Sequence, residues 1–260
     1  MANKKIGIYG KLESTANNKV ENLYIIVNNK SILFVVKHLL SNEFISVEHF
    51  EKEEASTPWK PLFAFLQNHS SLIQNYYKNI YFVNNSNRVI LSQTDTKDDA
   101  LLAAQELELI HGYQSAEEIY TSAIGEKHFL IYGVNDELSA LLTRYFHNGK
   151  WQHYASFFLQ NVSESEVQIR IFEDNFMVYI VENGKTKLLN YFSLGVEDQN
   201  VYTVLNACSN AGIDINNFSM TVWGFDQQHN FIEKLRPYFS SIHIKQVEQL
   251  PNTYSSYLIF

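Results

Sequence analysis

The predicted strands and helices of this chain follow the same order twice, and this repeat constrains the fold more than any other feature. In each half, three strand-like segments come first, and alternating helical and strand-like segments follow them. The first three strands are expected at residues 23–27, 31–36 and 44–50 in one half, and at 167–171, 176–181 and 188–194 in the other. Because a three-strand meander followed by right-handed α/β crossovers builds one mixed sheet, we expect a five-stranded sheet in each half.

The segments after each meander are bounded by residues that start or stop helices. Thr96, Asn135 and Asp198 each precede an apolar helical pattern and are predicted N-caps, because their side chains can accept a backbone N–H. Gly112 is predicted to end the helix that Thr96 begins. Further helices are expected at 59–77, 153–160 and 231–238, and further strands at 79–83, 88–91, 127–132, 220–223 and 242–247.

The repeat divides the 260-residue chain into two lobes. We expect residues 1–21 to form an N-terminal segment outside the fold, residues 22–150 the first lobe and residues 151–260 the second lobe. His147 and His153 flank a tryptophan near this boundary, and we interpret both as surface residues of a linker.

Composition excludes several classes of function. The formal net charge is −8, with 28 acidic and 20 basic residues, so nucleic-acid binding is not expected. No apolar run approaches the ~18–20 residues of a membrane-spanning helix, and no signal-peptide core is recognisable. The chain is therefore expected to be cytoplasmic and not to act at a membrane.

Cys208 is the single cysteine, so neither an internal disulfide nor a cysteine-based metal cage is expected. It lies on the apolar face of its predicted helix and is interpreted as a core residue. The aromatic C-terminal segment 254–260 is expected to dock on its own chain, because free apolar tails promote aggregation.

The motifs that most often mark catalysis are missing from the sequence. It contains no Walker loop, no Gly-x-Ser-x-Gly elbow and no His-Glu-x-x-His element, and its nine histidines do not follow metal-ligand spacing. A nuclease with a related sheet order would need a carboxylate on the first strand of a lobe, whereas residues 23–27 carry none. No catalytic residue and no metal ligand are therefore predicted.

Four segments carry a resemblance to a known fold family: 79–91, 128–146, 153–159 and 166–195. Together with the duplicated plan, they resemble the actin-like ATPase superfamily, whose fold is ribonuclease H-like. More closely, the chain looks like an uncharacterised bacterial family of unknown function with an actin-like ATPase fold, distantly similar to the pilus-assembly ATPases. The resemblance implies two α/β lobes, each with a mixed five-stranded sheet flanked by helices, but it does not carry an activity with it.

The nucleotide site that this resemblance implies is altered in the first lobe. Actin-like ATPases carry an Asp-x-Gly element in the first turn of each lobe, where the Asp positions hydrated Mg²⁺ and the Gly lets the backbone approach a phosphate. Residues 27–31 read Val-Asn-Asn-Lys-Ser, so Asn28 replaces the Asp and no Gly follows. An amide lacks the charge that Mg²⁺ favours. Asn28 and Lys30 are kept as candidate contacts in the cleft.

The corresponding elements of the second lobe are altered as well. Residues 172–176 read Phe-Glu-Asp-Asn-Phe, which keeps Asp174 but has no Gly. Gly195 stands where related proteins keep a glycine near the phosphates. Gly224 matches the first of two glycines that admit the adenosine, and Phe225 replaces the second. Asp174, Gly195 and Gly224 complete the set of candidate cleft residues.

We therefore predict a non-catalytic protein that binds a protein partner through the cleft between the lobes or through an exposed sheet edge. No cofactor is predicted. The alternative is a divergent nucleotide-binding protein, either an ATPase or a small-molecule kinase, that holds ATP with Mg²⁺ through residues such as Lys30 and Asp174. A third hypothesis, a nucleic-acid enzyme, predicts binding that falls steeply with salt.

Overall fold

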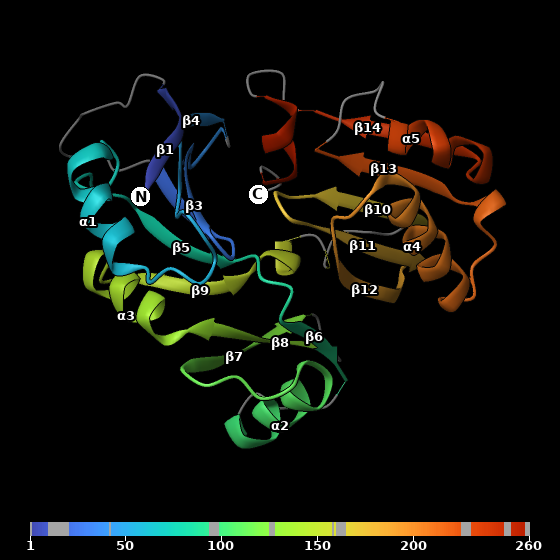
Figure 1. Cartoon of the computed structure of the whole chain (residues 1–260), viewed down its shortest axis with the longest axis horizontal. Coiled ribbons are helices and arrows are strands. Elements are labelled where there is room, and N and C mark those ends of the chain that lie inside the picture. Colours follow the sequence, from blue (N-terminus) through green and yellow to red (C-terminus); the bar gives the residue numbers. More distant parts are fainter. Residues whose placement is uncertain are drawn as a thin grey trace. The chain divides into compact units, whose positions relative to one another are not determined.

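A computed structural model of the chain describes residues 2–9, 21–41, 43–93, 99–124, 128–157, 159, 165–224, 230–246 and 251–257. The chain divides into two compact units, Met1–Ser156 and Phe157–Phe260. Figure 1 shows the helices and strands of each unit. Among the described helices, none combines the length and the apolar character that crossing a membrane requires.

The first unit is built on a six-stranded sheet with the strand order β1-β4-β3-β2-β5-β9. The pairs β2–β5 and β5–β9 are parallel, and the other pairs are antiparallel. The strands are β1 (Asn3–Tyr9), β2 (Glu21–Val27), β3 (Ser31–His38), β4 (Phe44–Glu51), β5 (Asn79–Asn84) and β9 (Gly149–His153).

Helices α1 (Lys60–His69) and α3 (Asp136–Tyr145) pack on this sheet, and a 3-10 turn, η1 (Tyr154–Phe157), follows β9. Alternate residues of the strands point toward the helices, as a sheet covered on that face requires. The resulting core includes Leu23, Phe34, Phe50, Leu62 and Leu142, all of them buried.

A smaller sheet is inserted between β5 and α3 of the first unit. It contains β6 (Val89–Ser92), β7 (Glu117–Ile124) and β8 (His128–Asn135) in the antiparallel order β6-β8-β7, and it carries helix α2 (Ala100–His111) (Figure 1). Ala103 and Leu107 of α2 pack on Ile131 of β8. We call these residues, 89–135, the insertion.

The second unit is a five-stranded sheet with the order β12-β11-β10-β13-β14. Its elements are β10 (Glu166–Ile171), β11 (Asn175–Glu182), β12 (Lys185–Ser193), α4 (Glu197–Asn210), η2 (Ile215–Asn217), β13 (Ser219–Trp223), α5 (Asn230–Leu235), η3 (Arg236–Tyr238), β14 (Ser241–Lys245) and η4 (Asn252–Tyr257). Helices α4 and α5 cover one face, and their core includes Val167, Val178, Cys208, Met220 and Ile232. The core position predicted for Cys208 is confirmed.

The two units repeat one topology, as the sequence predicted. The order β4-β3-β2-β5-β9 in the first sheet matches the order β12-β11-β10-β13-β14 in the second. Strand β2 therefore corresponds to β10, and β5 corresponds to β13. The first turn also repeats: the backbone N–H of Asn28 donates to Ser31 O over 3.0 Å, and that of Phe172 donates to Asn175 O over 2.9 Å. The insertion and β1 are additions to the repeat in the first unit.

The unit boundaries differ from those expected. Residues 1–21 were expected outside the fold, yet β1 pairs antiparallel with β4. The expected division after residue 150 would cut β9, which pairs in parallel with β5, and the structure instead divides the chain after Ser156. Strand β7 was not predicted either, because its residues are mostly half-buried and give no clear alternation.

Two of the three predicted N-caps need correction. Asn135 caps α3, because its side chain accepts the N–H of Leu138 over 3.1 Å. Helix α2 is capped by Asp99, which accepts the N–H of Leu102, and Thr96 lies outside the described residues. Asp198 is not a cap, because α4 begins at Glu197 after Val196.

The predicted helix ends are partly confirmed. Gly112 follows α2 with φ of 77°, a conformation that glycine adopts without strain. The helix expected at 59–77 ends at His69, and the described part of the range 153–160 contains only the short 3-10 turn η1.

Candidate functional site

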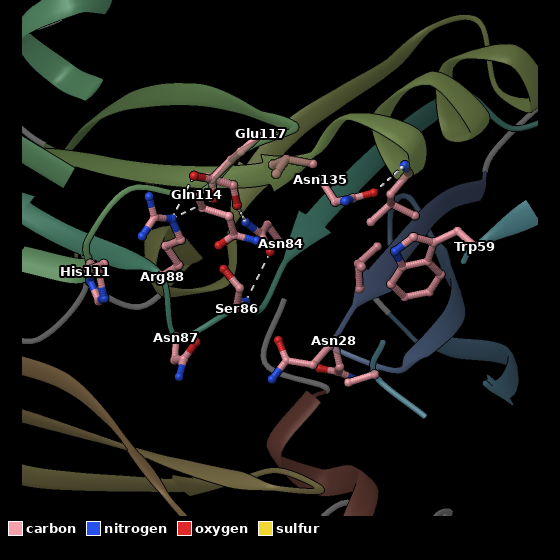
Figure 2. Close-up of a pocket in the computed structure, with 16 residues that line it drawn as sticks. Asn28, Trp59, Asn84, Ser86, Asn87, Arg88, His111, Gln114, Glu117 and Asn135 are labelled. Carbon is pink, nitrogen blue, oxygen red and sulfur yellow. Dashed lines mark hydrogen bonds and ion pairs between the residues drawn. The ribbon is translucent and has the colours of Figure 1, made fainter. Parts of the chain in front are cut away.

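A pocket of about 470 Å³ lies within the first unit, where β2 and β5 end (Figure 2). Because these strands are parallel, their carboxyl ends lie at the same edge of the sheet, and such edges are where α/β proteins form binding crevices. The insertion supplies the opposite wall through the end of β8 and the start of β7. Six amide side chains line the pocket: Asn28, Asn29, Asn84, Asn87, Gln114 and Asn135.

Asn84, the last residue of β5, ties the main sheet to the insertion. Its Nδ2 donates to the carbonyl of Gly133 on β8 over 2.8 Å, and its Oδ1 accepts the N–H of Ser86 over 3.1 Å. The second bond turns the chain sharply after β5, as asparagine side chains commonly do. The residues that follow, Ser86 to Arg88, are thereby placed in the pocket wall.

A nearly buried ion pair forms part of that wall. The Nε of Arg88 donates to both carboxylate oxygens of Glu117, over 2.8 Å and 2.7 Å, and the two side chains are only 11% and 5% exposed. Gly133 makes room for the pair, because a Cβ at this position would lie 1.6 Å from Glu117 Oε1. The pair brings one positive and one negative charge together, so it leaves the wall without net charge.

His153 forms a hydrogen bond with the segment that follows β5. Its Nε2 bonds the carbonyl of Ser86 over 3.1 Å, and its Nδ1 accepts the N–H of Ala155 over 3.1 Å, which places the proton on Nε2. Complete burial lowers the pKa of His153 to about 4. The prediction that His153 is a surface linker residue was therefore wrong: it lies on β9 and is fully buried.

The N-terminus of α1 faces this region, but a carboxylate from the chain already occupies it. Glu137 Oε2 accepts the N–H of Trp59 over 2.9 Å, and Oε1 accepts the N–H of Lys60 over 3.2 Å. Helix N-termini attract anions because they present backbone N–H groups and the positive end of the helix dipole. Glu137 meets both needs, so it takes the place of an external anion.

The two candidate cleft residues of the first unit are also engaged within the chain. Asn28 lines the pocket, but its Nδ2 donates to Ser31 Oγ over 2.8 Å and its Oδ1 accepts from Asn85 Nδ2 over 2.9 Å. Lys30 forms an ion pair with Glu51 at 2.6 Å and does not line the pocket. The structure thus brings Asn28, but not Lys30, to this site.

In the second unit, Asp174 and Gly195 make contacts with neighbouring side chains. The exposed Asp174 accepts a hydrogen bond from Asn175 Nδ2 over 2.8 Å. The N–H of Gly195 donates to Asn200 Oδ1 over 2.9 Å, and its carbonyl accepts from Asn200 Nδ2 over 3.0 Å. The N–H that a phosphate would use at Gly195 is therefore already bonded.

Gly224 is covered by the C-terminal turn η4. Its φ is 96°, and a Cβ at this position would lie 2.4 Å from Ser256 Oγ. The Ser256 hydroxyl accepts the N–H of Ile171 over 3.2 Å and donates to the carbonyl of Trp223 over 2.8 Å. Ser256 is completely buried, and the expected docking of the tail is confirmed for its described part, up to Tyr257. Phe225 lies outside the described residues.

Sequence reasoning missed Arg88, Glu117, His153 and Ser256. The sequence around Glu117 gives no indication of its partner Arg88, which lies 29 residues earlier. Within the ranges that the structure describes, no group of three or more His, Cys, Asp or Glu side chains is arranged to hold a metal ion.

Comparison with solved structures identifies the fold. The chain is similar to a protein of unknown function with an actin-like ATPase fold from Bacteroides thetaiotaomicron, with a TM-score of 0.79 and 12% identity over 95% of this chain and 99% of that one. The PilM-PilN type IV pilus biogenesis complex matches with a TM-score of 0.55 and 7% identity, over 93% of this chain and 98% of that chain. The ethanolamine utilization protein EutJ from Carboxydothermus hydrogenoformans matches with a TM-score of 0.53 and 6% identity, over 94% and 90%.

These likenesses establish that the chain has an actin-like ATPase fold. A comparison with curated proteins finds no match. The sequence profile of DUF3822, a family described as proteins of unknown function, matches residues 11–242, so the chain belongs to that family.

Proposed function

We propose that this protein is a non-catalytic member of the actin-like ATPase fold that acts by binding a protein partner. The observation that carries the proposal is the packing beside Gly224. The resemblance assigns the space at this glycine to the adenosine, yet Ser256 of the same unit fills it and bonds Ile171 and Trp223 at the ends of β10 and β13. A nucleotide would have to displace a buried turn before it could bind there.

The groups that could hold phosphates support the same proposal. Lys30 is paired with Glu51, the N–H of Gly195 is bonded to Asn200, and Lys234 is paired with Asp198 at 2.7 Å. Each would have to give up a contact within the chain to bind an anion. Phosphate binding therefore costs more here than in a site whose donors point into solvent.

A structural relative supports the partner-binding half of the proposal. PilM was solved in a complex with PilN, and that complex is described as serving type IV pilus biogenesis. The same fold can therefore present a surface to another protein. We extend only this general capacity to the present chain.

The test measures nucleotide binding and partner binding on the full chain. ATP with Mg²⁺ is titrated into the protein by calorimetry, and phosphate release is followed in parallel. We expect no saturable heat up to millimolar nucleotide and no phosphate release. A partner recovered from the native cells is expected in a fixed ratio to the chain, and adding ATP with Mg²⁺ should not release it. Micromolar nucleotide affinity with turnover, in the absence of a partner, would establish the divergent ATPase or kinase instead.

A further inference from the structure

We propose that the pocket of the first unit binds an extended, uncharged stretch of the partner polypeptide, seated beside the apolar end of helix α2. This inference rests on the proposed function and adds the place and the chemistry of the contact. The pocket volume of about 470 Å³ lies within the ~300–1,000 Å³ that is usual for binding sites.

Charge favours an uncharged occupant. Among the described residues that line the pocket, Arg88 and Glu117 are the only Lys, Arg, Asp or Glu side chains, and they are paired with each other. The nearby N-terminus of α1 is taken by Glu137. A ligand with a net charge would lose its hydration without gaining a counter-ion, which is unfavourable in a partly enclosed site.

The lining favours a polypeptide backbone. An amide side chain carries both donors and an acceptor, and each peptide unit carries one donor and one acceptor. Three of the lining amides already bond within the chain, those of Asn28, Asn84 and Asn135. Asn87 and Gln114 present their amides at exposed positions of the rim. Ser86 Oγ in the wall is buried and has no hydrogen-bond partner among the described residues. Buried polar atoms in folded proteins usually have a hydrogen-bond partner, so Ser86 Oγ is a further group of the wall that a peptide unit could bond.

An apolar surface adjoins the pocket at the end of α2. Leu109 is 83% exposed, Ile110 66% and Tyr113 79%, and the same stretch of chain contains His111 and Gln114, which line the pocket. Large apolar side chains gathered at one helix end commonly mark a contact surface. A polypeptide whose backbone lies among the amides could place an apolar side chain on these residues.

A neutral saccharide is the other ligand that an amide-lined pocket could accept. Saccharides usually stack on an open aromatic ring, but Trp59 is only 6% exposed, and Lys52 Nζ lies 3.9 Å from its ring centroid. Lys52 is held there by the carbonyls of Ala55 and Thr57. Trp59 is the only Phe, Tyr or Trp among the described lining residues, and the exposed Tyr113 lies outside that lining, so the pocket itself offers no open aromatic face for a saccharide.

The experiment selects random-sequence peptides, displayed on phage, against the full chain. The test variant combines Asn87→Asp with Gln114→Glu, which adds two carboxylates at the rim with little change in side-chain size. The control variant combines Gln67→Glu on α1 with Asn206→Asp on α4, both exposed and outside the pocket. Thermal unfolding of each variant checks that the fold is retained. A separate Leu109→Gln variant tests whether the apolar surface at the end of α2 contributes to peptide binding.

We expect the enriched peptides to be uncharged in the bound stretch, to carry an apolar residue, and to bind the rim variant about tenfold more weakly than the wild type or the control. Leu109→Gln should weaken the same peptides. Equal affinity for all variants, failure to enrich any peptide, or binding of neutral saccharides in place of peptides would each overturn the pocket proposal.

The failure of the pocket proposal can be distinguished from the failure of the proposed function. If the native partner binds the rim variant as tightly as the wild type, the pocket proposal fails while the proposed function stands. Turnover of ATP with Mg²⁺ would remove the proposed function, whichever peptides bind.

Discussion

The two units close the ends of their central parallel strands in different ways. In the first unit, β2 and β5 end beneath the insertion and leave a polar pocket. In the second unit, the corresponding strands β10 and β13 end against η4, whose Ser256 bonds Ile171 and Trp223. The repeated sheet sets where a crevice can form, whereas segments outside the repeat decide whether the crevice is open or filled.

The largest effect is expected at the wall of the open pocket. Glu117→Gln leaves Arg88 nearly buried without its counter-charge, and we expect it to lower the free energy of unfolding by about 3 kcal/mol. The control, Glu233→Gln, breaks an exposed pair with Arg236 and should cost less than about 0.5 kcal/mol. Urea unfolding measures both. Equal losses would mean that the ion pair does not hold the insertion against the pocket.

Gly224→Ala tests the filled crevice of the second unit. The new Cβ would meet Ser256 Oγ at 2.4 Å and Ile171 O at 2.8 Å, and φ is already 96°. We expect a loss of about 3 kcal/mol from strain and overpacking. Gly212→Ala is the matched control, because Gly212 has φ of 70° but open space around it, and about 1 kcal/mol is expected there. A similar loss for both variants in urea unfolding would argue against close packing of η4.

A pH dependence is expected from the loop that lines the open pocket. The pKa of His153 is about 4 in the folded protein, below its ordinary value of 6.5, because the ring is buried. Between these values the unfolded chain binds a proton that the folded protein excludes. This contribution to stability is therefore complete above pH 6.5 and is lost as the pH falls toward 4.

The measurement is urea unfolding at about pH 7 and about pH 5, where this histidine alone should cost about 2 kcal/mol. His153→Gln should be less stable at neutral pH but should lose less on acidification. An unchanged difference between the two pH values would show that His153 does not titrate between them.

The smallest effect is expected from Ser256→Ala, which keeps the shape of η4 but removes its hydroxyl. The N–H of Ile171 and the carbonyl of Trp223 then lose a partner, at a cost of about 1.5 kcal/mol. Hydrogen exchange should become faster at the amide of Ile171. Ser209→Ala, at an exposed position of α4, is the control. Equal exchange rates at the Ile171 amide in the two variants would contradict the bonding of β10 by Ser256.

Elements with strong local signals were predictable from the sequence. Helix α3 combines an asparagine cap with buried leucines at positions 138 and 142, and the Asn183-Gly184 turn places both residues at positive φ, as its sequence requires. Strand β1 was missed because its inward position 4 is a lysine, which is tolerated there only because Lys4 pairs with Glu48 at 2.6 Å. That partner lies on β4, far away in the sequence.

The candidate site was predicted less well, because its contacts join distant segments. The resemblance singled out Asn28 and Gly224 correctly as residues at strand ends, but it gave no sign that Asn85 and Ser256 would engage them. His153 was misread because a histidine between a glutamine and a tyrosine gives the same pattern on a surface and on a short buried strand. Only the pairing of β9 with β5 distinguishes the two.

The capping of α1 by Glu137 has a consequence for how the protein is made. Trp59 and Lys60 leave the ribosome well before Glu137, which lies 77 positions after Lys60, and the whole insertion is synthesised in between. The first turn of α1 therefore stays uncapped during that interval. We expect a nascent chain arrested before α3 to expose this turn to proteases, and a chain arrested after α3 to protect it.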